Sequence, residues 1–120
     1  MTYLKSFKEL IVWQKSIELA KEIFRITQLF PKSELYGITS QMRKCTVSIP
    51  SNIAEGYGRK SRGEYNQFLG IAYGSLLELE TQLILSEQLE FAEKKEFSFS
   101  NNLLTEVSKM LVSMQLKLKT

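Results

Sequence analysis

The feature that most constrains this chain is a proline, Pro50, inside a stretch that otherwise has the pattern of a helix. Proline in a helix interior removes one backbone hydrogen bond and clashes with the preceding turn, at a cost of roughly 3 kcal/mol. Gly56 and Gly58 follow and weaken the same helix further. A helix that contains such residues is expected to use them for a kink or for close packing. We therefore assign Pro50 and Gly56 to a structural motif.

The same segment carries a polar stripe, because polar residues recur in it every three or four positions. Its members are Gln41, Lys44, Ser48, Asn52, Glu55 and Arg59. Asn52 borders the apolar side, and a buried Asn needs hydrogen-bond partners, for which the carbonyl freed by Pro50 is one candidate. Glu55 has no visible partner for acid–base chemistry. We expect Asn52 and Glu55 to be structural, holding the kink or a neighbouring chain in register.

The residue types that are missing exclude several kinds of catalysis. The chain has no His and no Asp, and all 13 acidic residues are Glu. The usual Ser-His-Asp and Cys-His arrangements are therefore excluded. Cys45 is the only cysteine, which rules out a thiolate zinc site and an internal disulfide, and we interpret it as a small buried apolar residue. We expect no enzyme activity, no metal and no cofactor.

Apolar periodicity predicts four helices, at about residues 7–29, 34–58, 62–90 and 99–118. Ser33 is the expected N-cap of the second helix, and Ser61 with Glu64 makes a capping box for the third. The apolar stripes are Leu35, Ile38, Met42, Cys45 and Ile49 in the second helix, Tyr65, Leu69, Ala72, Leu76, Leu79 and Leu83 in the third, and Leu104, Val107, Leu111, Met114 and Leu118 in the fourth. Short connections predict one all-α domain over residues 1–120, an antiparallel up-down-up-down four-helix bundle.

The first helix has an unusually wide apolar surface made of two stripes about 120° apart. One stripe is Leu10, Trp13, Ile17, Ala20 and Phe24, and the other is Val12, Ser16, Leu19, Ile23, Ile26 and Phe30. One side of a small bundle needs less apolar surface than this, so we expect another subunit to cover part of it. The alternative is that this helix lies at the centre of its own bundle.

Positive charge is concentrated in the first half of the chain. Residues 1–62 contain 11 Lys and Arg against 5 Glu, whereas residues 63–120 contain 5 Lys against 8 Glu. Arg59, Lys60 and Arg62 cluster with Gly and Ser at the second junction, and such a turn can hold phosphate. Arg43 and Lys44 lie about four turns earlier. A solvated inter-helix loop is the alternative interpretation of this cluster.

Localisation is predicted from the N-terminal residues and from hydropathy. The first seven residues lack the apolar run and the cleavage site of a signal peptide. No uninterrupted apolar run approaches the roughly 18 residues of a membrane span. We therefore expect a cytoplasmic protein with no membrane partner.

Several strings in the chain resemble one family, the four-helix bundle proteins encoded in 23S ribosomal RNA intervening sequences. These strings are FKELIVWQK (residues 7–15), FPKSELYG (30–37), SQMRK (40–44), SIPSNIAEGYGR (48–59) and FLGIAYGSLLELE (68–80). The string at 48–59 is the most specific mark of that family. The resemblance spans residues 7 to about 90 in the correct order.

This resemblance implies a four-helix bundle that assembles into a homopentameric ring. It also implies kinship with the accessory protein of diversity-generating retroelements, a basic pentamer that binds nucleic acid and works with a reverse transcriptase. Carried over to matching positions, Arg43, Lys44, Arg59, Lys60 and Arg62 become candidate contacts to RNA or DNA. We therefore expect a non-enzymatic nucleic-acid-binding protein. A protein-interaction scaffold without nucleic acid is the alternative.

Overall fold

The structure, a computed structural model, describes residues 5–119 and is all-helical over that range, as predicted. Within it lie four α-helices and no strand: α1 (Ile11–Thr27), α2 (Ser40–Tyr57), α3 (Arg62–Gln88) and α4 (Ser98–Lys119). Shorter turns are η1 (Phe7–Glu9), η2 (Lys32–Glu34), η3 (Leu35–Thr39) and η4 (Lys94–Phe97). Residues 1–4, on which the expectation about a signal peptide partly rests, lie outside the described residues.

The first helix begins later than predicted, because Leu10 has an extended backbone (φ −70°, ψ 125°). This residue separates the single turn η1 from α1. Ser6 caps η1 by accepting a hydrogen bond from the Lys8 backbone N–H at 3.1 Å. The helix predicted from residue 7 is therefore a short turn followed by α1.

The second helix also begins later than predicted, at Ser40 instead of residue 34. The backbone of Gly37 is non-helical (φ −108°, ψ −115°), which breaks the segment into η3 and α2. Ser33 lies inside the turn η2 and does not cap α2, so its prediction as N-cap is wrong. Leu35 belongs to the irregular part and is 44% exposed, although the apolar spacing had placed it in the core.

The start of α3 is as predicted. The hydroxyl oxygen of Ser61 accepts a hydrogen bond from the Glu64 backbone N–H at 3.1 Å, and it lies 3.2 Å from the Glu64 carboxylate. This pairing satisfies one of the amide groups that a helix leaves without an internal partner at its first turn. The turn between α2 and α3 is thereby fixed at residues 58–61.

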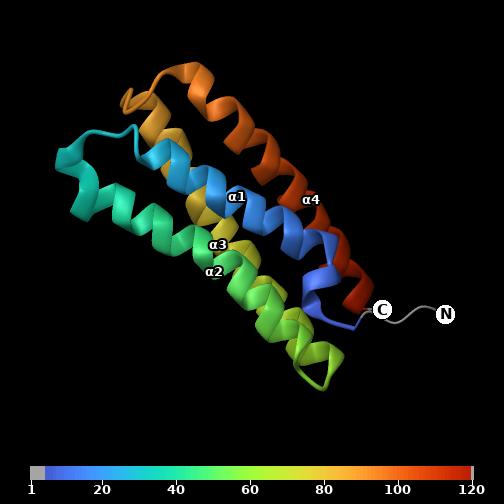
Figure 1. The fold of residues 1–120 in the computed structure, drawn as a ribbon. Coiled ribbons are helices and arrows are strands. Elements are labelled where there is room, and N and C mark those ends of the chain that lie inside the picture. The colour runs from blue at the N-terminus through green and yellow to red at the C-terminus, as the bar shows by residue number, and fades with distance from the viewer. Residues whose placement is uncertain (1–4, 120) are drawn as a thin grey trace.

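The helices form an elongated bundle of 48 × 23 × 23 Å (Figure 1). Helix α2 packs between α1 and α3, and α4 packs between α3 and α1, so that α1 and α3 lie diagonally opposite. The α2–α3 turn lies at the same end of the bundle as the start of α1 and the end of α4, and the other two connections lie at the far end (Figure 1).

The core is formed by one stripe from each helix. Its fully buried members, all under 2% exposed, include Leu19, Ile23, Ile26, Met42, Ile49, Ile53, Leu69, Leu76, Leu79 and Phe97. On α1 the second predicted stripe, from Val12 to Phe30, is the buried one. The first stripe is partly uncovered, since Trp13 and Ile17 are half-buried and Phe24 is 40% exposed.

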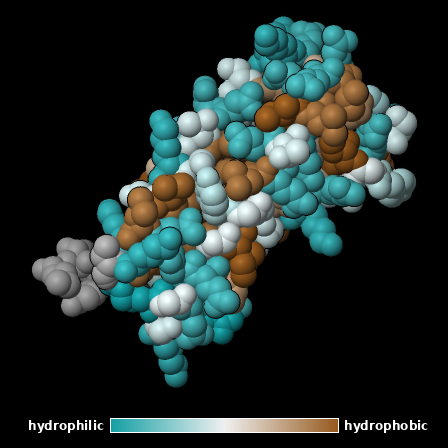
Figure 2. Space-filling view, turned by 180° about the vertical axis from the view of Figure 1, so that it is seen from behind, coloured by the Kyte–Doolittle hydropathy of each residue, from teal (hydrophilic) through white to brown (hydrophobic). Residues whose placement is uncertain are grey.

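Helix α3 is apolar on both sides. Its inward residues are buried, whereas Ile71, Leu77, Ile84 and Leu85 on other sides are 43–52% exposed. Figure 2, which shows the molecule from the side where α3 is nearest, has several apolar patches along this surface.

By length and composition α3 is the one described helix that could cross a bilayer, with 28% of its most apolar window buried. Core helices pass the same test, so this match is weak support for a membrane.

Candidate functional site

The turn between α2 and α3 presents the cationic cluster that the sequence predicts. Helix α2 ends at Tyr57 with Gly58 as its C-cap, and Ser61 caps α3, so Arg59 and Lys60 fall in the connection itself. Arg62 opens α3. All three cationic residues are exposed to solvent. A tight turn at the tip of the bundle thus carries three positive charges within four residues.

Arg59 is held in place by two neighbours. One terminal guanidinium nitrogen lies 3.2 Å from a Glu55 carboxylate oxygen, and the guanidinium carbon lies 4.6 Å from the centre of the Phe68 ring. The cation–π contact orients the planar group, while the exposed ion pair contributes little to stability. The side chain is still 40% exposed, so part of the guanidinium faces solvent. Glu55 therefore forms an exposed ion pair with Arg59, and its predicted role in holding the kink or a neighbouring chain in register stays a prediction.

Arg62 connects the α2–α3 turn to the end of α4. Its guanidinium donates a hydrogen bond of 2.8 Å to the backbone carbonyl of Lys117, in the last turns of α4. Lys117 and Lys119 therefore lie at the same tip. We call the group of five cations the basic end: Arg59, Lys60, Arg62, Lys117 and Lys119. Sequence reasoning missed the two lysines of α4, although an even number of helices joined by short turns returns the C-terminus to the α2–α3 turn.

Arg43 and Lys44 lie elsewhere on the molecule. At a rise of 1.5 Å per residue, Lys44 is about 20 Å along α2 from Tyr57, where the helix ends before Arg59. Arg43 is half-buried: its Nε donates to the Thr27 hydroxyl at 2.9 Å, and its guanidinium lies 5.2 Å from the Phe24 ring centre. It fastens α2 to α1. The structure brings Arg59, Lys60 and Arg62 together and leaves Arg43 and Lys44 apart from them.

Asn52 takes part in a polar network between α2 and α3. Its side-chain amide donates to the Ser48 carbonyl at 2.8 Å and to the Ser48 hydroxyl at 3.0 Å, and that hydroxyl lies 2.9 Å from the hydroxyl of Ser75. The sequence suggested that Asn52 would donate to the carbonyl freed by Pro50, which belongs to Thr46, four residues earlier. Asn52 donates to the Ser48 carbonyl instead. Its amide lies one turn above Ser48 on the same side of the helix, which makes Ser48 the nearer acceptor.

Cys45 belongs to the same network and is a buried thiol, as predicted. The thiol lies 3.0 Å from the Ser75 carbonyl and 3.2 Å from a Glu78 carboxylate oxygen. Burial, reinforced by the neighbouring Glu78 carboxylate, raises the pKa of Cys45 to about 12. At neutral pH the residue is therefore a protonated hydrogen-bond donor and a poor nucleophile.

Gly56 lies at a close approach of α2 to α3. A Cβ atom there would lie 2.8 Å from the Phe68 Cβ and 3.2 Å from the Tyr65 carbonyl oxygen. Only glycine fits this contact without moving the helices apart. The contact also places Phe68 under Arg59, so that the packing at Gly56 supports one cation of the basic end.

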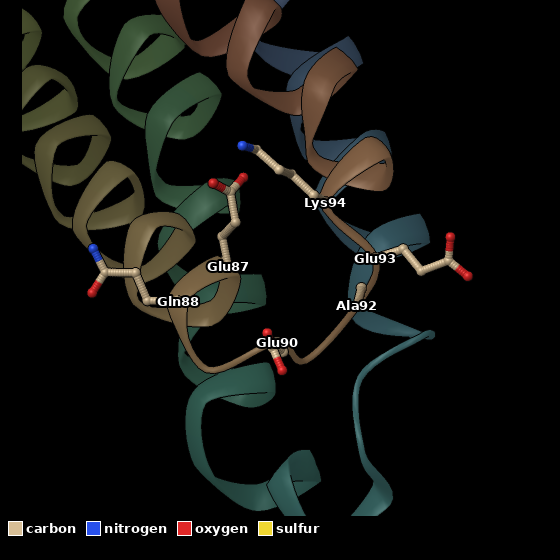
Figure 3. A pocket seen from close by; sticks show the side chains of 6 residues that line it. All are labelled: Glu87, Gln88, Glu90, Ala92, Glu93 and Lys94. Atoms are coloured by element: carbon tan, nitrogen blue, oxygen red, sulfur yellow. The ribbon is translucent and has the colours of Figure 1, made fainter.

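The far end of the bundle, at the α3–α4 connection, is lined mainly by acidic side chains. An open cavity of about 750 Å³ lies beside the α3–α4 connection and is lined by Glu87, Gln88, Glu90, Ala92, Glu93 and Lys94. In Figure 3 the side chains of Glu87 and Lys94 point toward each other across it, whereas that of Glu93 points away. Among the described residues, no group of three His, Cys, Asp or Glu side chains could hold a metal ion.

The comparisons with known proteins agree with this architecture. The family described as "23S rRNA-intervening sequence protein" matches residues 8–113. A crystal structure of a protein of unknown function from Bacteroides thetaiotaomicron, assigned to the S23 ribosomal protein family, superposes with a TM-score of 0.81 at 27% identity. The match covers 88% of this chain and 98% of that one. None of the curated proteins matches. The chain therefore belongs to the 23S rRNA-intervening sequence protein family.

Proposed function

We propose that this protein is a non-enzymatic, oligomeric helical bundle that binds RNA or DNA with low sequence specificity through its basic end, in the cytoplasm. The observation that carries the proposal is the convergence of Arg59, Lys60 and Arg62 with Lys117 and Lys119 at one tip. Cations on an exposed tip make phosphate contacts, which give affinity without reading base sequence. Glu55 and Glu64 lie nearby and reduce the local charge, so each copy is expected to bind weakly.

Assembly would compensate for weak single contacts. In this proposal, antiparallel up-down-up-down bundles associate into a homopentameric ring, and five tips act on one polyanion. Two observations support association: Trp13, Ile17 and Phe24 on α1 are incompletely covered, and α3 exposes apolar side chains along its outward side. Such extended apolar surface is unusual on a single small bundle.

The second candidate function is a protein-interaction scaffold with no nucleic acid. It is favoured by the same exposed apolar surface on α3, which suits a protein partner better than a phosphate backbone. On the resemblance described above, a reverse transcriptase is one candidate partner. The two functions make opposite predictions about salt, because apolar contacts tolerate salt and phosphate contacts do not.

The test is fluorescence anisotropy with labelled 30-nucleotide RNA and DNA strands at 50 and 300 mM salt. The test variant replaces Arg59, Lys60 and Arg62 by Gln. We expect binding by the native protein at low salt only. The variant should reduce the slope of log affinity against log salt by about 2, for three lost contacts to a single strand.

The matched control replaces Lys32, Lys94 and Lys95 by Gln at the far end and removes the same charge. Retained binding by this control, together with loss in the basic-end variant, supports the proposal. Equal loss in both variants would mean that bulk charge alone attracts the nucleic acid. An oligomer that ignores both strands at 50 mM salt would favour the scaffold.

A further inference from the structure

A groove between α2 and α3 is lined by polar side chains and one thiol. It has a volume of about 300 Å³, and its lining residues are Gln41, Lys44, Cys45, Ser48, Ser75 and Glu78. The four on α2 share one side of that helix, because they lie three, four and seven positions from Gln41. The two on α3 are three positions apart and share a side in the same way. A groove of this volume is large enough for a small molecule.

The floor of this groove is held by a hydrogen-bond network. Cys45 is buried, Ser48 and Ser75 are half-buried, and the thiol lies 3.0 Å from the Ser75 carbonyl. The two serine hydroxyls lie 2.9 Å apart, and the Ser48 hydroxyl also accepts from the Asn52 amide at 3.0 Å. The two hydroxyl groups carry two protons, and only one of these can lie between their oxygens. Among the described residues the other proton has no acceptor, so the floor offers a hydrogen-bond donor to the groove.

The rim of the groove carries one amide, one cation and one carboxylate. Gln41, Lys44 and Glu78 are all exposed. Over the part of the chain that the structure describes, Lys44 and Glu78 form no ion pair with each other, and the side chains of Gln41 and Lys44 make no hydrogen bond. The Glu78 carboxylate lies 3.2 Å from the Cys45 thiol, which leaves most of its acceptor positions open. Opposite charges therefore line the same groove without direct contact between them.

This mixture of groups selects the class of ligand. A simple anion would meet the Glu78 carboxylate, and a simple cation would meet the Lys44 ammonium group. A metal ion is disfavoured, since the groove has a single carboxylate and the Cys45 thiol keeps its proton at neutral pH. A nucleobase needs an aromatic or apolar surface to stack on, and the lining has none. A small molecule that carries both charges would satisfy both charged groups of the rim.

We propose that this groove binds a small zwitterion, namely a free α-amino acid with a short polar side chain such as L-serine. The ligand carboxylate pairs with the Lys44 ammonium group and the Gln41 amide, and the ligand ammonium group pairs with the Glu78 carboxylate. The available hydroxyl proton on the floor donates to a ligand oxygen. Because the charged groups of the rim are open to water, we expect an affinity in the millimolar range. The site includes no residue of the basic end, so it is independent of the proposed nucleic-acid binding.

The test is saturation-transfer NMR, observed on the ligand, with the full chain and three probes. The probes are L-serine, N-acetyl-L-serine, which lacks the ammonium group, and L-serinamide, which lacks the carboxylate. We expect saturable binding of L-serine and about tenfold weaker binding of each analogue, because each has lost one charge-assisted contact. Equal binding of all three probes, or no binding of L-serine, would overturn the proposal.

Variants of the rim connect binding to the groove. Glu78→Gln and Lys44→Gln each remove one rim charge, and each should weaken L-serine binding about tenfold. The matched controls are Glu80→Gln on α3 and Lys21→Gln on α1, which remove the same charges from exposed residues outside the groove. Both controls should bind L-serine as the native protein does. Native-like binding by both rim variants would place the ligand elsewhere and contradict the proposal.

Circular dichroism checks the folding of every variant, because Glu78→Gln also changes the contact with the Cys45 thiol. The Lys44 side chain is exposed and makes no hydrogen bond or ion pair within the described residues, so its replacement leaves the bundle intact. If Glu78→Gln fails to fold, Lys44→Gln alone decides the matter. Weakened L-serine binding by folded Lys44→Gln supports the proposal, and unchanged binding rejects it.

Discussion

The two sides of α3 differ in what covers them. Toward α2 and the core, Leu69, Leu76 and Leu79 are completely buried, and Gly56 of α2 approaches so closely that a single methyl group would collide. On the outward side, Leu77 and Ile84 are about half exposed, and the space beside Gly74 is empty. One helix therefore has an apolar side that is packed against its neighbours and an apolar side that is exposed. Apolar composition alone does not distinguish them, because both sides are apolar.

The largest expected effect separates two neighbouring leucines. Leu76→Ala removes a fully buried side chain and should lower the free energy of unfolding by about 2–5 kcal/mol, since it leaves a cavity in the core. Leu77→Ala, one position away and 43% exposed, is the control. Chemical denaturation of the two variants and the native protein measures both losses. Equal losses at the two positions would mean that the two sides of α3 are packed alike.

The next effect concerns the close contact at Gly56. Gly56→Ala places a methyl group 2.8 Å from the Phe68 Cβ, and we expect a loss of about 1–3 kcal/mol from the strain of overpacking. Because Phe68 supports Arg59, the variant should also weaken nucleic-acid binding at low salt. Thermal melting and anisotropy measure the two consequences. An unchanged melting temperature would show that α2 and α3 can separate at little cost.

A third prediction uses the thiol between α2 and α3 as a pH probe. Folding raises the pKa of Cys45 to about 12, so the folded state keeps a proton that the unfolded chain loses above about pH 9. The resulting stability is complete below pH 9 and declines as the pH rises toward 12. Relative to Cys45→Ser, the native protein should lose about 1 kcal/mol of unfolding free energy between pH 9 and 10. If the unfolding free energies of the two proteins change with pH in the same way, the thiol is not buried as the structure shows.

The smallest effect should have the opposite sign. Gly74→Ala adds a methyl group in open space and removes the flexibility of glycine from a helix, which should stabilise the single chain by about 0.5–1 kcal/mol. Measured by chemical denaturation, this gain contrasts with the loss at Gly56. Destabilisation at Gly74 would indicate that the outward side is already in contact within one chain.

Much of the inner packing could be predicted from the sequence. The spacing of Leu69, Leu76 and Leu83 identified the buried side of α3, and Ser61 with Glu64 located its start. These features are local, because they depend on helical periodicity and on groups three residues apart. Leu35 was misplaced because periodicity assumes a continuous helix, and the non-helical backbone of Gly37 interrupts it.

The candidate site was only partly predictable for the same reason. Arg59, Lys60 and Arg62 are close in sequence and could be recognised as a cluster. Lys117 joins them through a hydrogen bond from Arg62 across 55 positions, which no local pattern reveals. The packing of Arg43 against Phe24 was equally invisible, since charge alone does not tell whether a cation faces solvent or a neighbouring ring.

The shape of the molecule gives its charge distribution a direction. The bundle is about twice as long as it is wide, with the basic end at one tip and residues 87–96, four Glu against two Lys, at the other. Such a rod has an electric dipole along its long axis. In the field of a polyanion it would rotate tip-first before any contact forms, and the rate of association would respond to ionic strength more than the lifetime of the complex.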